Sequence, residues 1–216
     1  MRLIDCALVK NKIPPATVKR LSLYLSCVSE VDNKKPRISS EKLAKLAQVN
    51  PAQVRRDLSY LGSLGTRGVG YDVSTLKNQL KIELGLVKGW SVIIVGVGNL
   101  GTALAQYGGF EDKGFGIAGL YDVDKKKVSS KVAGLIVKPL EKIDEDTKKY
   151  KVAIGIIATP AEFAQATANV LIDAGIKSIL NFAPSRLEGT DDVVIRNVDL
   201  SQELQVLSYY LDEPLE

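Results

Sequence analysis

Residues 91–101 read SVIIVGVGNLG, an apolar run followed by three glycines with the spacing GxGxxG. The apolar run is typical of a buried strand and the residues from Asn99 onward favour a helix, so the glycines fall in the turn between them. In such a turn Gly96 permits the tight bend, Gly98 lets the backbone approach a pyrophosphate, and Gly101 allows close packing of helix on strand. The stretch predicts a phosphate-binding turn made of Gly96, Val97, Gly98, Asn99, Leu100 and Gly101.

Strand and helix patterns continue this α/β arrangement from residue 85 to residue 198. Apolar strand patterns occur at 91–95, 117–121, 134–137, 152–158, 177–181 and 192–195, and helix patterns at 99–107 and 161–174. Strands that are apolar on both faces and alternate with helices are typical of a parallel sheet with helices on both sides. We therefore expect a Rossmann-like parallel sheet domain over residues 85–198.

The end of the second strand favours NAD(H) as the ligand. Asp122 follows Gly101 by 21 residues, and a carboxylate there accepts hydrogen bonds from the adenosine ribose and repels a 2′-phosphate. Lys125, Lys126 and Lys127 follow and weaken that preference. The pattern leaves open a sheet that binds no ligand, or one that binds another nucleotide such as a coenzyme A derivative.

Two later strand ends are expected to line the nicotinamide half of the pocket, because ligands bind at the carboxyl ends of strands in an open parallel sheet. Their residues are Thr159, Pro160, Asn181, Phe182, Ala183 and Pro184. The alternative is ordinary termination of the strands by proline.

The charge of the chain is unevenly distributed. Residues 1–84 contain 15 Lys and Arg against 7 Asp and Glu, a net charge of +8, whereas residues 85–216 contain 14 against 18, a net charge of −4. A basic first part joined to an acidic second part indicates that only the first part meets a polyanion.

Residues 1–84 show the element order of a winged helix-turn-helix domain. Helix patterns occur at 16–31, 40–47, 51–61 and 74–84, with a very short strand at 37–38. The first helix is expected to bury Val18, Leu21, Leu25, Val28 and Val31, with Lys19 and Arg20 outside; the second, Leu43, Leu46 and Ala47; the third, Val54, Leu58 and Leu61. Four glycines within residues 62–73 exclude a helix and favour a hairpin, the wing.

The third helix of such a domain enters the major groove, and six residues are expected to contact DNA: Gln53, Arg55, Arg56, Ser59, Tyr60 and Arg67. Arg55 and Arg56 can reach guanine edges or phosphates, and Gln53 can either pair with adenine or complete the helix cap at Asn50. Ser59 and Tyr60 suit phosphates, and Arg67 in the hairpin suits a narrow minor groove. Asp57 is expected to orient a neighbouring arginine. The alternative for the arginines is a solvated surface.

A final amphipathic helix is expected over residues 199–211. Its apolar positions recur at i, i+4, i+7 and i+11 and are Leu200, Leu204, Leu207 and Leu211. This face either packs on the sheet of its own chain, which the sequence alone favours, or docks on a second copy of the protein.

The composition excludes several other classes of protein. The chain has no histidine and two cysteines, Cys6 and Cys27, which removes Ser/His and Cys/His nucleophile pairs, a structural zinc site and a disulfide scaffold. The spacing of Tyr121 and Lys125 matches the proton relay of one reductase class, but that relay needs a helix and this segment ends a strand. No apolar run is long enough to cross a membrane. We expect a cytoplasmic protein without a bound metal.

At this point the chain resembles a known family. Residues 54–60 (VRRDLSY), 65–71 (GTRGVGY), 96–101 (GVGNLG) and 181–184 (NFAP) are similar to the redox-sensing transcriptional repressors of the Rex family, and the resemblance runs from about Ile13 to Leu211. It implies a homodimeric repressor, not an enzyme, that binds NADH and NAD+ and occupies palindromic operators of double-stranded DNA until NADH releases it. The alternative is a small NAD-dependent oxidoreductase with a basic accessory domain.

The resemblance also assigns roles near the nicotinamide. Family members exchange the final helix between subunits, so it favours a dimerisation helix over residues 199–216, after a DNA-binding domain at 1–84 and an NAD(H)-binding domain at 85–198. It implies that Tyr107 and Asp199 lie near the nicotinamide and respond to ligand. Ser26 and Leu200 depart from the basic and aromatic residues that are common in relatives.

Overall fold

The structure is a computed structural model that describes residues 13–31, 36–66 and 68–212, with side chains to residue 211. The chain divides into two compact units, Met1–Lys88 and Gly89–Glu216. Each unit has its own buried core, as expected for units that fold separately.

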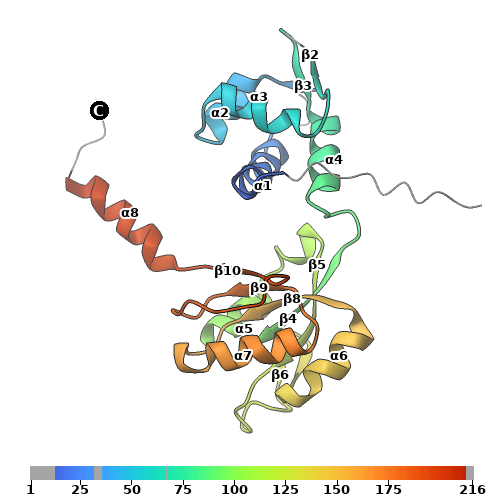
Figure 1. Ribbon diagram of the computed structural model, residues 1–216, viewed down its shortest axis with the longest axis vertical. Helices are drawn as coiled ribbons and strands as arrows, with labels where there is room; N and C mark the ends of the chain where they lie inside the picture. The colour runs from blue at the N-terminus through green and yellow to red at the C-terminus, as the bar shows by residue number, and fades with distance from the viewer. Residues whose placement is uncertain (1–12, 32–35, 67, 213–216) are drawn as a thin grey trace, which may run out of the picture. The chain divides into compact units, whose positions relative to one another are not determined.

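The first unit is a winged helix-turn-helix (Figure 1). Its helices are α1 (Pro15–Ser29), α2 (Ser40–Leu46), α3 (Pro51–Ser59) and α4 (Val73–Glu83). Three described strands form an antiparallel sheet in the order β1-β3-β2, namely β1 (Arg37–Ile38), β3 (Gly70–Asp72) and β2 (Gly65–Thr66). The predicted elements of this unit are confirmed, with ends that shift by one or two residues.

Local sequence signals explain where these helices begin. The Asn50 side chain accepts a hydrogen bond from the Ala52 N–H and Pro51 occupies the first turn, so α3 starts where a cap and a fixed φ coincide. Ser39 caps α2 and Asp72 caps α4 in the same way. Gly70 has φ +89°, and a Cβ there would lie 2.5 Å from the carbonyl oxygen of Ile38, so the wing needs glycine at this position.

Two aliphatic residues that were predicted to lie in the core of the first unit are exposed in the structure. Leu21, Val28, Leu43 and Val54 are buried as expected, but Val18 is 42% exposed and Leu46 47% exposed. The buried face of α1 is rotated toward Thr17 and Tyr24. The reason is a polar contact between α1 and α3, described below, which the spacing of apolar residues does not reveal.

The second unit is built on one twisted sheet with the described strand order β10-β9-β8-β4-β5-β7-β6 (Figure 1). The strands are β4 (Trp90–Val95), β5 (Phe115–Tyr121), β6 (Lys131–Val132), β7 (Leu135–Lys138), β8 (Val152–Ile157), β9 (Ser178–Asn181) and β10 (Val194–Asn197). All neighbours are parallel except β6, which pairs antiparallel with β7. The Rossmann-like α/β fold class is confirmed.

Helices cover both faces of this sheet. Ile93 and Val95 of β4 pack with α6 (Ile143–Tyr150) and α7 (Ala161–Asp173), whereas Val92 and Ile94 face α5 (Asn99–Gln106). The sequence prediction missed β6, α6 and the two short 3-10 helices, Glu111–Lys113 and Leu140–Lys142. Helix α6 is mostly charged and buries only Ile143, Asp146 and Thr147, so its apolar periodicity is weak.

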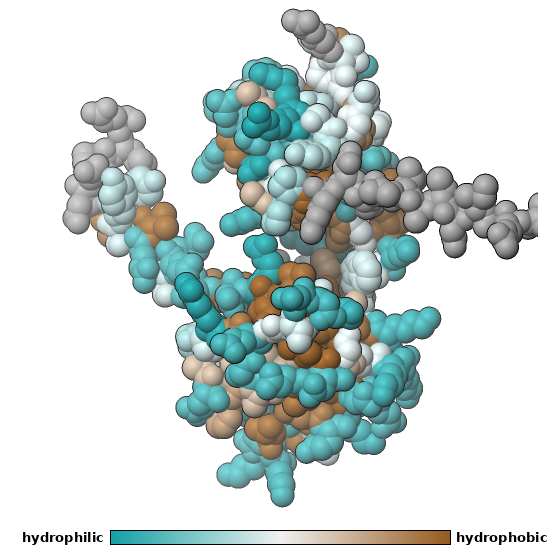
Figure 2. All heavy atoms as spheres, in the orientation of Figure 1, coloured by the Kyte–Doolittle hydropathy of each residue, from teal (hydrophilic) through white to brown (hydrophobic). Residues whose placement is uncertain are grey.

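The last helix, α8 (Leu200–Asp212), contributes no described side chain to the core. Leu200 is 65% exposed, Leu204 67%, Leu207 60% and Leu211 84%, and Figure 2 shows apolar atoms on its surface. The expectation that α8 packs on the sheet of its own chain is therefore wrong. Among the residues described, no helix is both long and apolar enough to span a bilayer.

Candidate nucleotide pocket and nucleic-acid interface

A cavity of about 520 Å³ opens at the carboxyl edge of the sheet in the second unit. The loops that follow β4, β5, β8 and β9 form its walls. Nine of the predicted coenzyme residues line it: Gly96, Gly98, Asn99, Leu100, Asp122, Thr159, Pro160, Phe182 and Pro184. The structure therefore brings together segments that are up to 88 residues apart in the sequence.

The glycine turn is shaped for an anion. Gly96 has φ +94°, and a Cβ there would lie 2.7 Å from the carbonyl of Ala158, while a Cβ at Gly101 would collide with the Gly96 carbonyl oxygen. At Gly98 an added Cβ would meet nothing within 4 Å. Gly98 is also the N-cap of α5 and supplies no side-chain cap. The first N–H groups of α5 are thus left for a ligand such as a pyrophosphate.

Asp122 lies beside this turn and is only 5% exposed. Its Oδ2 accepts hydrogen bonds from the Val97 N–H at 2.8 Å and the Lys127 ammonium at 3.0 Å, and its Oδ1 accepts from the Asp124 N–H at 2.9 Å. Burial raises the pKa of the Asp122 carboxyl, but these hydrogen bonds outweigh burial and hold it below its ordinary value. The carboxylate is therefore charged at neutral pH and can accept hydrogen bonds from ribose hydroxyls.

Four predicted coenzyme residues lie behind the wall of the cavity. Val97 and Gly101 are buried, and the Val97 N–H is the one that holds Asp122. Asn181 is fully buried; its Nδ2 donates to Ser185 O at 2.8 Å and Asn197 Oδ1 at 2.9 Å, and its Oδ1 accepts from the Ala183 N–H at 2.9 Å. Asn181 thus shapes the loop that carries Phe182 and Pro184, and none of the four residues, the fourth being Ala183, lines the cavity itself.

Tyr107 lies apart from this cavity. It ends α5, its ring meets the Phe110 ring edge-on at 5.1 Å between centroids, and it borders a second, apolar cavity of about 420 Å³ on the α5 face of the sheet. Asp199 is exposed and accepts hydrogen bonds from the Ser201 N–H and hydroxyl, which lower the pKa of its carboxyl. In this single chain Asp199 caps the start of α8.

Sequence reasoning missed several residues that line the nucleotide pocket. Phe163 and Thr167 come from α7, Leu140 from a short helix, and Val123, Asp124 and Lys127 from the turn after β5. Lys127 was recognised only as part of a lysine run. The spacing of Phe163 three residues after Pro160, in the first turn of a helix that begins at the pocket, is a signal that could have identified it.

The surface of the first unit that carries the predicted DNA contacts is centred on α3. Arg56, Ser59 and Tyr60 are exposed, and the Ser59 hydroxyl donates to the Arg56 carbonyl at 2.7 Å. Arg55 is also exposed, but its Nη1 donates to Ser40 Oγ at 3.0 Å and Glu41 Oε1 at 3.2 Å. The predicted contact Arg67 lies outside the described residues.

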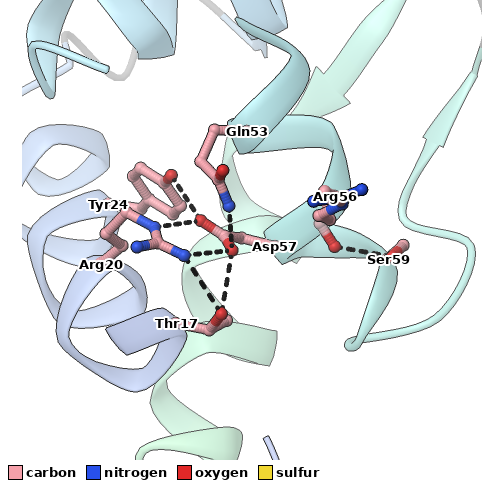
Figure 3. A network of polar contacts seen from close by, with 7 residues as sticks. All are labelled: Thr17, Arg20, Tyr24, Gln53, Arg56, Asp57 and Ser59. Carbon is pink, nitrogen blue, oxygen red and sulfur yellow. Dashed lines mark hydrogen bonds and ion pairs between the residues drawn. The ribbon is translucent and has the colours of Figure 1, made fainter. Parts of the chain in front are cut away.

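Gln53 makes a contact that neither sequence alternative included. Its Nε2 donates to Asp57 Oδ1 at 2.9 Å, so the side chain turns toward the interior of the unit (Figure 3). The alternative in which Gln53 completes the helix cap at Asn50 is not seen, because the Gln53 amide is directed to Asp57 in place of the start of the helix.

Asp57 is fully buried and joins α3 to α1 (Figure 3). Besides Gln53, its carboxylate accepts hydrogen bonds from Thr17 Oγ1 at 3.0 Å, Tyr24 Oη at 2.9 Å, and Arg20 Nε and Nη2 at 2.6 and 2.8 Å. Burial raises the pKa of Asp57, but the hydrogen bonds lower it more, so the net shift is downward. The expectation that Asp57 orients a neighbouring arginine of α3 is wrong, because its carboxylate faces α1 and its arginine partner is Arg20. Arg20 was expected to lie outside and is partly buried.

Known protein families match both units. A family model described as CoA binding domain matches residues 87–185, and one described as Putative DNA-binding protein N-terminus matches residues 12–59. The redox-sensing transcriptional repressor Rex of Streptomyces avermitilis is 50% identical over 199 residues, which are 92% of this chain and 79% of that protein. Rex of Desulforamulus reducens is 45% identical over 201 residues, 93% of this chain and 96% of that protein.

Solved structures give the same result. The crystal structure of RSP, a Rex-family repressor, matches with a TM-score of 0.86 and 39% identity over 93% of this chain and 94% of that one. RSP in complex with β-NAD+ and operator DNA matches with a TM-score of 0.86 and 39% identity, covering 93% of each chain. RSP in complex with β-NADH matches with a TM-score of 0.86 and 38% identity, covering 94% of this chain and 95% of that one.

Proposed function

Because this chain belongs to the Rex family of redox-sensing transcriptional repressors, we propose that it represses transcription according to the ratio of NADH to NAD+. The winged unit binds operator DNA and the sheet unit binds NADH and NAD+, the ligands that the structures of its relative RSP contain. One observation carries the proposal: the same chain has a helix with exposed arginines, α3, and a pocket lined by a glycine turn and Asp122.

Different residues of the pocket bind three different parts of the coenzyme. The free N–H groups at the start of α5, beside Gly98, bind the pyrophosphate, and Asp122 binds the adenosine ribose. The walls formed by Thr159, Pro160 and Phe182 take the nicotinamide half. Val97, Gly101, Asn181 and Ala183 act from behind the wall, because each is buried or held by neighbouring protein atoms.

In the winged unit, α3 enters the major groove of the operator. Arg56 and Arg55 read guanine edges or neutralise phosphates, and Ser59 and Tyr60 contact the backbone. Arg67 is proposed to enter the adjoining minor groove. Gln53 is held by Asp57, so its first contribution is to fix the helix and not to read a base.

The working form is proposed to be a homodimer. The exposed leucine face of α8 has no covering within the described chain, and burying a leucine contributes about 1.5–3 kcal/mol. Exchange of α8 between two copies covers this face and places two recognition helices on successive major grooves of a palindrome. With two cysteines, one of them buried and free, the protein suits the cytoplasm.

Regulation then follows from two states of the dimer. One state matches the half-site spacing of the operator, and the other is favoured when the pockets hold reduced coenzyme. DNA and NADH therefore oppose each other through one coupling free energy, which must be reciprocal. The nicotinamide ring carries a positive charge only when oxidised, and Asp199, brought near it by the exchanged helix, is proposed to sense that difference.

The competing function is a small NAD-dependent oxidoreductase. The Tyr121 hydroxyl donates to Asp146 Oδ2 at 2.7 Å and the side chain is fully buried, so the pair of Tyr121 and Lys125 is not arranged as a proton relay. The absence of histidine removes the commonest general base. We therefore propose a regulator without enzymatic activity, and incubation with NADH and a panel of carbonyl compounds tests this directly.

A mobility-shift titration on palindromic DNA with and without NADH tests the main proposal. The protein is expected to bind without NADH and to be released as NADH replaces NAD+, and NADH is expected to bind more weakly when operator is present. Equal operator affinity at every ratio of NADH to NAD+ would overturn the proposal.

A further inference from the structure

Lys127 occupies a position in the nucleotide pocket that its two lysine neighbours do not share. It follows β5 in a turn closed by the hydrogen bond from its own N–H to Asp124 O at 2.9 Å. Its side chain lines the pocket, is 39% exposed, and places the ammonium 3.0 Å from Asp122 Oδ2. Lys125 and Lys126 are exposed and do not line the pocket. The backbone of the turn therefore selects one lysine of three.

The acceptor capacity of Asp122 is nearly filled by the protein. A carboxylate offers roughly four acceptor positions, and the described donors to Asp122 are the Val97 N–H, the Asp124 N–H and the Lys127 ammonium. One position remains, whereas two ribose hydroxyls need two. The two backbone donors belong to the glycine turn and the β5 turn. Lys127 is the one on a flexible, partly exposed side chain, so it is the donor that a ribose diol can displace.

The displaced ammonium stays near the ribose because the Lys127 backbone is held in its turn. An unphosphorylated ribose itself offers the ammonium no anionic group. Beside a 2′-phosphorylated ribose it faces a phosphate, and lysine binds phosphate as a point charge. Asp122 has the opposite preference, since its carboxylate repels that phosphate.

We propose that Lys127 is a specificity-determining residue of this pocket: Asp122 selects the unphosphorylated ribose of NAD(H), and Lys127, released from Asp122, is the ligand for a 2′-phosphate. The pair sets how strongly the protein discriminates against NADP(H), with Asp122 dominant as long as its carboxylate is present. The inference rests on the proposed binding of dinucleotides in this pocket and adds the residue that opposes Asp122 within it.

The test measures the dissociation constants of NADPH and NADH, by coenzyme fluorescence, for the full-length protein and its variants. Lys127→Met is expected to raise the ratio of the NADPH to the NADH dissociation constant about tenfold, the size of one charge-assisted contact. Lys125→Met removes the same charge from the same loop outside the pocket and is the matched control, with the ratio expected to stay within about twofold of the original protein.

If NADPH binds the original protein too weakly to measure, the same two lysine substitutions are compared in a protein that also carries Asp122→Asn. Asp122→Asn is expected to lower the ratio of the NADPH to the NADH dissociation constant. In this variant, adding Lys127→Met is expected to raise the ratio again about tenfold, whereas adding Lys125→Met is not. Equal ratios for the Lys127 and Lys125 variants in the measurable background would overturn the role of Lys127. A protein that binds neither NADH nor NADPH contradicts the proposed function instead. Operator binding without coenzyme checks that each variant is folded.

Discussion

Arg20 of α1 donates from Nε and Nη2 to the two carboxylate oxygens of Asp57 in α3, at 2.6 and 2.8 Å (Figure 3). This bidentate ion pair holds the recognition helix near its C-terminal end, because Asp57 is the seventh of the nine residues of α3. Asp57 is fully buried while the Arg20 side chain is 27% exposed. The contact therefore fixes the angle between the two helices, and with it the direction in which Arg56 points.

Removing one partner should destabilise the winged unit. Arg20→Ala leaves a buried carboxylate with neutral donors only, and we expect a loss of about 1.5–3 kcal/mol in the free energy of unfolding, the range for a hydrogen bond to a charged group. Lys19→Ala, an exposed neighbour, serves as control and should change stability little. Urea unfolding of the two variants measures the difference, and equal midpoints would contradict the assigned role.

The Asp57 contribution should also depend on pH. The pKa of this carboxyl is lower in the folded protein than its ordinary value of 3.8, so the unfolded chain binds the proton first as pH falls. The stabilisation is thus present above pH 3.8 and is lost as pH falls through the lower folded pKa. We expect the stability difference between the original protein and Asp57→Asn to be constant near neutrality and to shrink in this acidic window.

Arg56 should contribute directly to operator binding. The side chain is exposed on α3 and is turned away from the Asp57 contacts (Figure 3). Arg56→Ala is expected to weaken binding by about 1–3 kcal/mol if it reads a base edge, with relaxed preference at one base pair. If it contacts a phosphate, the slope of log binding constant against log salt concentration should become shallower by about one. Lys81→Ala on α4 is the control, and fluorescence anisotropy with operator variants separates the outcomes.

Asp122 should matter for coenzyme but not for DNA. Asp122→Ala removes the acceptor for the ribose hydroxyls, so we expect NADH to bind about tenfold more weakly or worse, a loss of one to two charge-assisted hydrogen bonds. Operator binding by the coenzyme-free protein should stay unchanged. Calorimetric titration with NADH and a mobility shift without it measure the two quantities, and loss of both would indicate misfolding.

The leucine face of α8 should control assembly. Leu204 and Leu207 are 67% and 60% exposed in the single chain, so replacing both with Asp should leave the fold of one chain intact and dissociate the dimer. Gln205→Glu adds a charge on the same helix away from this face and should leave assembly unchanged. Sedimentation equilibrium reports the mass; a double variant that stays dimeric would show that α8 is not the dimer contact.

Part of the nucleotide site could be read from the sequence because backbone requirements are local. The glycine spacing at Gly96, Gly98 and Gly101 identifies the turn, since a Cβ at Gly96 or Gly101 would collide with backbone. The carboxyl ends of neighbouring parallel strands must also meet at one edge of the sheet. Whether a side chain faces the cavity or the protein interior, in contrast, is not determined by its neighbours in the sequence. Asn181 carries a polar side chain at a strand end, yet it is turned inward by hydrogen bonds to Asn197 and Ser185.

Local signals in the sequence were enough to predict the fold class and the ends of most helices and strands to within two residues, although β6 and α6 were missed. Caps such as Asn50 and Asp72, glycine turns and apolar periodicity act over a few neighbouring residues. The choice of partners among the polar groups, in contrast, could be seen only in the folded chain. Asp57 meets Arg20 across 37 positions of chain, and Lys127, alone among three adjacent lysines, reaches Asp122. Such pairings depend on the packing of whole helices and turns, which no short pattern encodes.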